Sequence, residues 1–88
     1  MYTKEDRKQQ VISVLWGGTE PLTITQLGRV VGLRRTPYLM SIIDELEFEG
    51  WICVVGVVQV GSLPARVYDL TFDAELHISE AEGVQVDS

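Results

Sequence analysis

The sequence predicts one small α+β domain that is built from three helices and a small antiparallel β-sheet, followed by a short C-terminal appendage. The helices are predicted because apolar residues recur at helical spacing in three segments before residue 50, and each segment ends at glycine. The sheet is predicted because residues 51–60 are rich in β-branched side chains and residues 65–71 alternate between apolar and polar ones. A chain of 88 residues is long enough for one domain with a small core.

The first helix is expected over residues 4–16. Its polar start, KEDRKQQ, consists of good helix formers. The apolar positions that follow recur at helical spacing: Val11, Ile12, Leu15 and Trp16. The pair Gly17-Gly18 ends this helix, and a short extended segment around Leu22 follows it.

The second helix is expected to begin after Thr23 and to end at Val31. A threonine at the N-cap and a glutamine three residues later, here Gln26, form a capping box in which each side chain accepts a hydrogen bond from the other residue's backbone N–H. Gly32 then supplies the C-cap, because glycine adopts the left-handed backbone conformation without strain.

The third helix is expected over residues 36–49. Thr36 is a suitable N-cap, Pro37 suits the first helical position, and Gly50 ends the helix. The stripe that should face the core consists of Leu39, Ile42, Ile43 and Leu46. The end of the helix is acidic, and a solvated face is expected from Asp44, Glu45, Glu47 and Glu49.

The residues after the third helix predict a β-hairpin and then an acidic segment. Residues 51–60 and 65–71 are the expected strands, joined by a turn around GSLP at 61–64. Residues 1–71 would form the folded domain. Residues 72–88 are an acidic C-terminal segment that is expected to hold a short helix around residues 73–82 and to be partly flexible, with frayed residues from Gly83 onward.

Charge is distributed unevenly along the chain. Residues 1–68 carry seven basic and seven acidic residues, whereas residues 69–88 carry six acidic residues and no lysine or arginine, which accounts for the net charge of −6. Between Glu20 and Asp44 the only charged residues are Arg29, Arg34 and Arg35. A local positive patch can therefore exist on an acidic protein.

Composition disfavours several classes of protein. The longest apolar run, residues 51–60, is about half of the ~20 residues that a membrane span needs, and the N-terminal residues are too polar for a signal peptide, so a cytoplasmic location is expected. One cysteine, Cys53, and one histidine, His77, cannot form an internal disulfide or a structural zinc site. The sequence has no phosphate-binding glycine loop and no base placed beside a nucleophile, so neither a cofactor nor enzymatic activity is expected.

The junction of the second and third helices has the residue pattern of a helix-turn-helix. Such a motif needs a small residue where the two backbones approach and a turn residue that tolerates positive φ. The sequence offers both within an apolar framework: Leu27, Gly28, Val31, Gly32 and Leu33. The next buried positions are expected at Leu39 and Ile42 rather than at Tyr38 and Ser41, as though the turn were one residue longer than in the simplest pattern.

The stretch LRRTPYLMSIIDELEFEGWI and the hairpin after it resemble the recognition helix and wing of winged helix-turn-helix transcriptional regulators, the MarR type in particular. The resemblance covers roughly residues 8–71. The tripeptide Arg35-Thr36-Pro37 is also similar to the start of the recognition helix in GntR-type regulators, although its distance to LEFEG is one residue longer than in that family. Relatives often carry basic residues at the positions of Ser41 and Glu45 and have wing tips richer in lysine and arginine.

The resemblance implies a winged helix-turn-helix fold and a sequence-specific transcriptional regulator, prokaryotic or viral, that binds double-stranded DNA. Residues 34–41 would begin a helix that enters the major groove, and residues 60–66 would form the wing. The DNA-binding residues implied in this way are Arg34, Arg35, Thr36, Tyr38, Met40, Ser41 and Arg66. Such proteins read paired half-sites as homodimers, so a homodimer is expected.

The first strand of the hairpin favours a second interpretation. Strict alternation would direct Trp51, Cys53, Val55 and Val57 to one face and Ile52, Val54 and Val58 to the other, so that both faces would be apolar. One face should then have a partner, which could be a second copy of the chain, the C-terminal segment folded back, or another protein. The alternative to DNA binding is accordingly a winged-helix protein–protein interaction module that uses the strand at residues 51–60.

Overall fold

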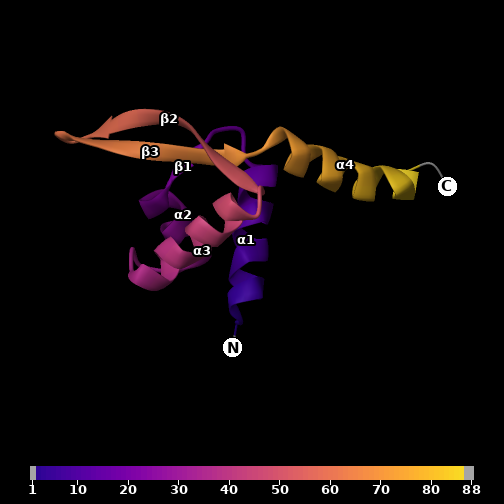
Figure 1. Cartoon of the computed structure of the whole chain (residues 1–88), viewed down its shortest axis with the longest axis horizontal. Coiled ribbons are helices and arrows are strands. Elements are labelled where there is room, and N and C mark those ends of the chain that lie inside the picture. Colours follow the sequence, from indigo (N-terminus) through magenta and orange to yellow (C-terminus); the bar gives the residue numbers. More distant parts are fainter. Residues whose placement is uncertain (1, 87–88) are drawn as a thin grey trace.

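The computed structural model describes the backbone of residues 2–86 and the side chains of residues 2–81. The described residues form an α+β fold with four helices and a three-stranded antiparallel sheet (Figure 1). In chain order the elements are α1 (Lys4–Gly17), β1 (Leu22–Thr23), α2 (Ile24–Val31), α3 (Pro37–Phe48), β2 (Ile52–Val60), β3 (Leu63–Leu70) and α4 (Phe72–Val86).

The expectation of three helices with a short appendage is wrong in its helix count. The C-terminal segment forms a fourth helix, α4, of 15 residues, which continues past Gly83 to Val86 instead of ending near residue 82. The expectation of fraying at residues 87 and 88 lies outside the described residues.

The helix boundaries follow from the caps that the sequence contains. The Thr23 hydroxyl accepts a hydrogen bond from the Gln26 N–H at 3.2 Å, and the Gln26 side chain accepts one from the Thr23 N–H at 2.9 Å, which confirms the capping box of α2. Thr36 caps α3 by accepting a hydrogen bond from the Leu39 N–H at 3.3 Å. Gly32 ends α2 with a φ of 77°, as expected for a left-handed C-cap.

Helices α2 and α3 approach each other closely at Gly28. A Cβ atom on this residue would lie 2.6 Å from Cδ2 of Leu39 and 2.7 Å from the carbonyl oxygen of Leu33. Both distances are much shorter than van der Waals contact, so a larger residue would force α2 away from Leu33 and α3. The expected role of Gly28 as the small residue at the helix crossing is confirmed.

The core lies between the helices and the base of the sheet. Leu39 and Ile42 are fully buried, whereas Tyr38 is exposed and Ser41 is half-buried, which confirms the expected spacing across the turn. The buried apolar cluster consists of Val11, Ile12, Leu15, Leu27, Val31, Leu39, Ile42, Ile43, Leu46, Ile52, Tyr68, Leu70 and Ala74. These side chains are removed from water only when the helices and the sheet pack together in this arrangement. The cluster therefore fixes the position of α3 against the sheet.

Strand β3 is the centre of the sheet, with β1 on one side and β2 on the other. The pairing of β2 with β3 contains one irregularity, since Val54 lies opposite Tyr68 and Gly56 lies opposite Val67. Val55 is therefore an extra residue that β3 does not match, which makes this point a β-bulge.

The bulge changes which side chains of β2 share a face, because directly opposed residues in neighbouring strands point to the same side of a sheet. Val57 lies opposite Arg66 and belongs to the inner face, which also carries the buried Ile52. Val58 lies opposite Ala65 and belongs to the outer face with Cys53, which lies opposite Asp69. The expectation from strict alternation, with Val57 beside Cys53 and Val58 beside Ile52, is therefore wrong beyond the bulge.

The β2–β3 hairpin and α4 extend from opposite ends of the molecule (Figure 1). The extents along the principal axes are 51, 31 and 21 Å. The radius of gyration is 13.7 Å, whereas a compact domain of this length would have about 12 Å. The hairpin and α4 thus project from the body that contains the core.

Thr71 connects β3 to α4 and holds the start of that helix against the body. Its hydroxyl donates a hydrogen bond to the Gly50 carbonyl at 2.6 Å and accepts one from the Ala74 N–H at 3.0 Å. Ala74 is buried in the core, and the ring of His77 meets that of Trp51 edge-on, with 5.6 Å between the ring centroids. The first turns of α4 are thus attached to the body, and the remainder points away from it (Figure 1).

Candidate nucleic-acid interface

The loop between α2 and α3 carries the two adjacent arginines of the candidate interface. Arg34 and Arg35 are both exposed, and neither forms an ion pair with any residue that the structure describes. The loop is fixed at its start by the Gly32 turn, where the Leu33 N–H donates to the Gly28 carbonyl at 2.7 Å, and at its end by the Thr36 cap. The two guanidinium groups are therefore carried by a short loop between two fixed points.

The first turns of α3 supply the remaining helical residues of the predicted set. Tyr38 and Met40 are exposed, while Thr36 and Ser41 are half-buried. Thr36 already accepts the capping hydrogen bond of Leu39, and the Ser41 hydroxyl donates to the Tyr38 carbonyl at 2.8 Å. Tyr38 and Met40 thus present free side chains, whereas Thr36 and Ser41 use their hydroxyls in local hydrogen bonds.

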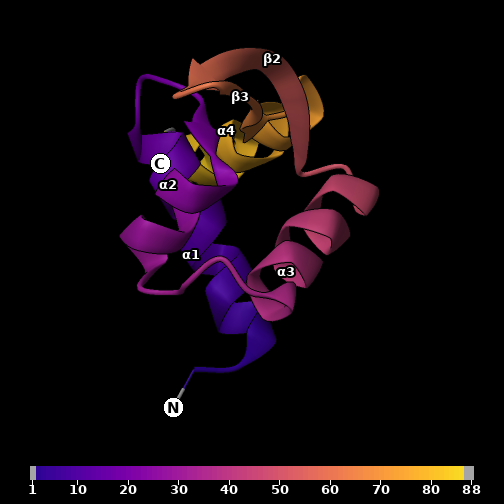
Figure 2. The same ribbon diagram turned by 90° about the vertical axis from the view of Figure 1, so that its left-hand side faces the viewer.

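Arg66 reaches the surface from a different element. It lies on β3 opposite Val57, on the inner face of the hairpin, and its side chain is exposed without an ion pair among the described residues. The hairpin tip and the loop that leads into α3 lie on the same side of the molecule, away from α4 (Figures 1 and 2). The loop that carries Arg34 and Arg35 and the hairpin that carries Arg66 therefore extend toward the same end of the protein.

The acidic end of α3 is reached by solvent, and two of its four acids also form ion pairs. The ammonium group of Lys8 on α1 lies 3.0 Å from a carboxylate oxygen of Glu45 and 3.0 Å from one of Glu49. Lys4 pairs with Glu45 as well, and Glu5 lies 3.5 Å from Lys8. The acids therefore join the end of α3 to α1.

The pKa values within this ion cluster are shifted in the directions that the pairing requires. Hydrogen bonds from Lys4 and Lys8 lower the pKa of the Glu45 carboxyl below its ordinary value of 4.5. Hydrogen bonds to Glu45 and Glu49 raise the pKa of the Lys8 ammonium above its ordinary value of 10.5, although burial acts in the opposite direction. Glu45 and Lys8 are consequently both ionised at neutral pH.

Lys8 is the main residue that the sequence interpretation missed. Its side chain is only 4% exposed, although it belongs to the polar start of α1. Lys4 and Lys8 are four residues apart on one helix, and so are Glu45 and Glu49 on another. Two stripes of opposite charge at the same helical spacing are the signal that could have predicted the pairing.

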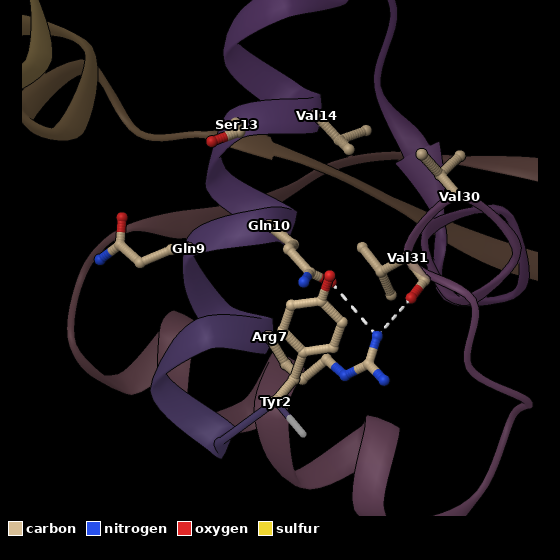
Figure 3. Close-up of a pocket in the computed structure, with 8 residues that line it drawn as sticks. All are labelled: Tyr2, Arg7, Gln9, Gln10, Ser13, Val14, Val30 and Val31. Atoms are coloured by element: carbon tan, nitrogen blue, oxygen red, sulfur yellow. Dashed lines mark hydrogen bonds between the residues drawn. The ribbon is translucent and has the colours of Figure 1, made fainter.

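Arg7 on α1 forms a hydrogen bond with the last residue of α2. Its Nη1 atom donates to the Val31 carbonyl at 2.6 Å and to the Gln10 side-chain oxygen at 3.3 Å (Figure 3). The guanidinium also lies over the ring of Tyr2, 4.8 Å from its centroid. Because Val31 immediately precedes the Gly32 turn, Arg7 ties α1 to the point where the chain leaves α2.

The same residues line an open pocket between α1 and α2, shown in Figure 3. Its walls are formed by Tyr2, Arg7, Gln9, Gln10, Ser13, Val14, Val30 and Val31. Elsewhere in the described chain no group of three or more histidine, cysteine, aspartate or glutamate side chains could hold a metal ion. Among the described helices, none has the length and apolar character that crossing a bilayer would require.

No family model matches the chain, and no curated protein is similar to it in sequence.

Proposed function

We propose that the chain is a winged helix-turn-helix protein that binds double-stranded DNA and regulates transcription in the cytoplasm of a prokaryote or of a prokaryote infected by its virus. The observation that carries the proposal is the division of charge along α3. Exposed arginines precede its first turn, whereas two of the four acids at its other end, Glu45 and Glu49, are paired with Lys4 and Lys8 of α1.

The placement of the arginines before the N-terminus of α3 supports this proposal, because a recognition helix contacts bases mainly with its N-terminal residues. The N-terminus of a helix carries a positive partial charge, which adds to that of Arg34 and Arg35 and favours phosphate. Glu45 and Glu49 would repel phosphate if they were free, but their pairing with lysines reduces that repulsion. The chain thus limits unfavourable charge beside the surface that would meet DNA.

The side chains at this end have suitable chemistry. The planar guanidinium of Arg34 or Arg35 can donate two hydrogen bonds to guanine or to a phosphate. Tyr38 and Met40 add exposed apolar surface that could contact bases or sugars. Arg66, from the hairpin, would act as the basic residue of the wing.

The proposal is tested by measuring affinity over a salt series for a duplex that the wild-type protein enriches from a random-sequence library. Arg34→Ala and Arg35→Ala should each cost about 1–3 kcal/mol if the residue reads a base, or reduce the salt slope by roughly one phosphate if it contacts the backbone. Arg34→Lys separates these cases, because lysine keeps the charge but loses the bidentate fork.

Arg29→Ala is the matched control, since it removes one exposed arginine from α2 outside the predicted contact set. A loss as large as that of Arg34→Ala would mean that only total charge matters. If the wild-type protein enriches no sequence and binds no duplex even at low salt, DNA binding is excluded and the second candidate function takes its place.

The second candidate is a protein–protein interaction module, and the observation that favours it is the composition of the hairpin. Its tip exposes several valines and one leucine, while Arg66 is the only charged residue between Gly50 and Val67. A wing that relies on phosphate contacts would carry more positive charge. Failure to bind duplex DNA, combined with retained folding, would favour this function.

A further inference from the structure

Strand β2 forms an open edge of the sheet. The strand order is β1-β3-β2, so β3 occupies one side of β2 and no strand of the described chain pairs with the other. β2 has nine residues and is therefore about 30 Å long at a rise of about 3.3 Å per residue. The backbone N–H and C=O groups that point outward along this edge can form hydrogen bonds with another strand.

The edge lacks the charges and prolines that usually prevent such pairing. From Trp51 to Leu63 the chain contains no charged residue and no proline. The bulge at Val55 interrupts the edge near its base, which leaves residues 56–60 as a regular segment toward the tip. This segment is the part of the edge best suited to accept a second strand.

The tip segment exposes valines on both faces, and Gln59 is its only polar side chain. On the outer face Val58 is 43% and Val60 is 58% exposed, and on the inner face Val57 is 61% exposed. A strand that pairs with this edge would meet β-branched side chains without charge, so its recognition would depend on backbone hydrogen bonds and apolar contact. Such a partner should itself be an uncharged, β-branched strand.

We propose that β2 pairs antiparallel with β2 of a second copy of the chain, about a two-fold axis at Val58. In this register Val58 lies opposite itself, and Gly56 lies opposite Val60 of the partner. Both residues belong to the outer face, so the valine row of one copy continues into the other. Val57 would lie opposite Gln59 of the partner on the inner face. The two sheets would thus join into one.

The distribution of charge favours self-association through this surface. Each copy carries a net charge of −6, so two copies repel one another at most orientations. The hairpin tip is free of acids, and α4, with exposed Asp73, Glu75 and Glu80, extends from the opposite end (Figure 1). Contact between two hairpins therefore brings uncharged surfaces together and keeps the acidic helices apart.

Symmetry also predicts the size of the assembly. A two-fold contact uses the same edge on both copies and therefore closes after two chains. The edge that remains at the other end of each sheet is β1, which has only two residues. The pairing should consequently give a dimer rather than a fibre, and it does not depend on whether the protein binds DNA.

The experiment compares Val58→Lys with Leu63→Lys by sedimentation at high micromolar concentration. Val58 is at the proposed axis, where two lysines would face each other, whereas Leu63 is 70% exposed on the same face of the hairpin but lies on β3, away from the edge. Wild type and Leu63→Lys should sediment with twice the chain mass, and Val58→Lys with the mass of one chain. Circular dichroism checks that each variant is folded.

Two single-cysteine variants give an independent result if Val58→Lys fails to fold. In a Cys53→Ser background, Val58→Cys should form a disulfide-linked dimer with oxidised glutathione, while Leu63→Cys should remain monomeric on a denaturing gel. A monomeric wild type, a dimer that survives Val58→Lys, or equal cross-linking of the two cysteine variants would each overturn the proposal.

Discussion

The Nζ atom of Lys8 on α1 lies 3.0 Å from a carboxylate oxygen of Glu49 at the end of α3. The Lys8 side chain is 4% exposed, whereas those of Glu45 and Glu49 are 43% and 44% exposed. The two sides of this ion cluster therefore differ in their access to water. Loss of the acids would leave a buried positive charge with little solvation, while loss of the lysine would leave acids that water can reach.

The first prediction is that removal of the acids destabilises the fold more than removal of the lysine. The double variant Glu45→Gln/Glu49→Gln should lower the urea midpoint further than Lys8→Met, which keeps most of the apolar stem of the side chain. Urea denaturation at neutral pH measures both. Equal midpoints, or a greater loss for Lys8→Met, would show that the lysine charge is better hydrated than its burial indicates.

The second prediction concerns the pH dependence of Glu45. Because Lys4 and Lys8 lower its pKa, its contribution to stability is present above the ordinary pKa of 4.5 and is lost as pH falls through the lower value in the folded state. The raised pKa of Lys8 acts on the opposite side, since its contribution is present below 10.5 and is lost only as pH rises through the raised value. The cluster is therefore intact across the neutral range.

Glu45→Gln should accordingly be less stable than wild type by a constant amount near neutral pH, and the difference should shrink as pH falls below 4.5. Urea denaturation at a series of pH values measures the difference. Glu47→Gln is the control, because Glu47 is exposed and forms no ion pair within the described chain. A difference that persists at low pH would mean that Glu45 stabilises the fold by packing rather than by charge.

The third prediction tests the close approach of α2 and α3. Gly28→Ala should destabilise the protein by about 1–3 kcal/mol, because its Cβ atom would clash with Leu39 and with the backbone of Leu33. The clash must exceed the gain of about 1 kcal/mol that alanine brings to a helix interior. Gly17→Ala is the matched control, since nothing lies within 4 Å of its Cβ position, and it should leave the thermal midpoint unchanged or raise it. An unchanged midpoint for Gly28→Ala would contradict the observed helix crossing.

The fourth prediction concerns the acidic helix α4. Deletion of residues 73–88 would remove the buried Ala74, so neutralisation of the exposed acids is the better test. The triple variant Asp73→Asn/Glu75→Gln/Glu80→Gln should bind mixed-sequence duplex DNA more tightly than wild type, and most strongly at low salt. Electrostatic repulsion is screened over about 8 Å at physiological ionic strength and extends further as salt is removed. A gain that is equal at all salt concentrations would contradict an electrostatic role for α4.

The elements that could be predicted from the sequence are those that depend on near neighbours in the chain. Thr23 and Gln26 form a capping box because they are three residues apart, and Gly32 and Thr36 mark the ends of the turn by their own conformational preferences. The positions of Arg34 and Arg35 at the start of α3 follow directly from these boundaries. The exposed loop of the candidate interface could thus be located without a structure.

The features that could not be predicted depend on contacts between distant parts of the chain. A β-bulge has no fixed residue pattern in the sequence. The face of the sheet to which Val57 or Val58 belongs therefore follows only from the residues opposite them on β3. The burial of Lys8 depends on where α3 crosses α1, and the attachment of α4 to the body depends on the hydrogen bond between Thr71 and the distant Gly50. Periodicity within one segment shows which residues share a face, and the packing partner of that face becomes apparent only when distant segments are compared.

The placement of α4 opposite the hairpin gives the protein an electric dipole moment along its long axis. At one end lies α4 with the exposed Asp73, Glu75 and Glu80, and toward the other end lies the α2–α3 loop with the exposed Arg34 and Arg35. In the field of any polyanion, this dipole produces a torque that turns the arginine end toward the charged surface before contact is made. Fewer encounters then begin in a wrong orientation, so a protein with net negative charge can still associate quickly with a negatively charged partner.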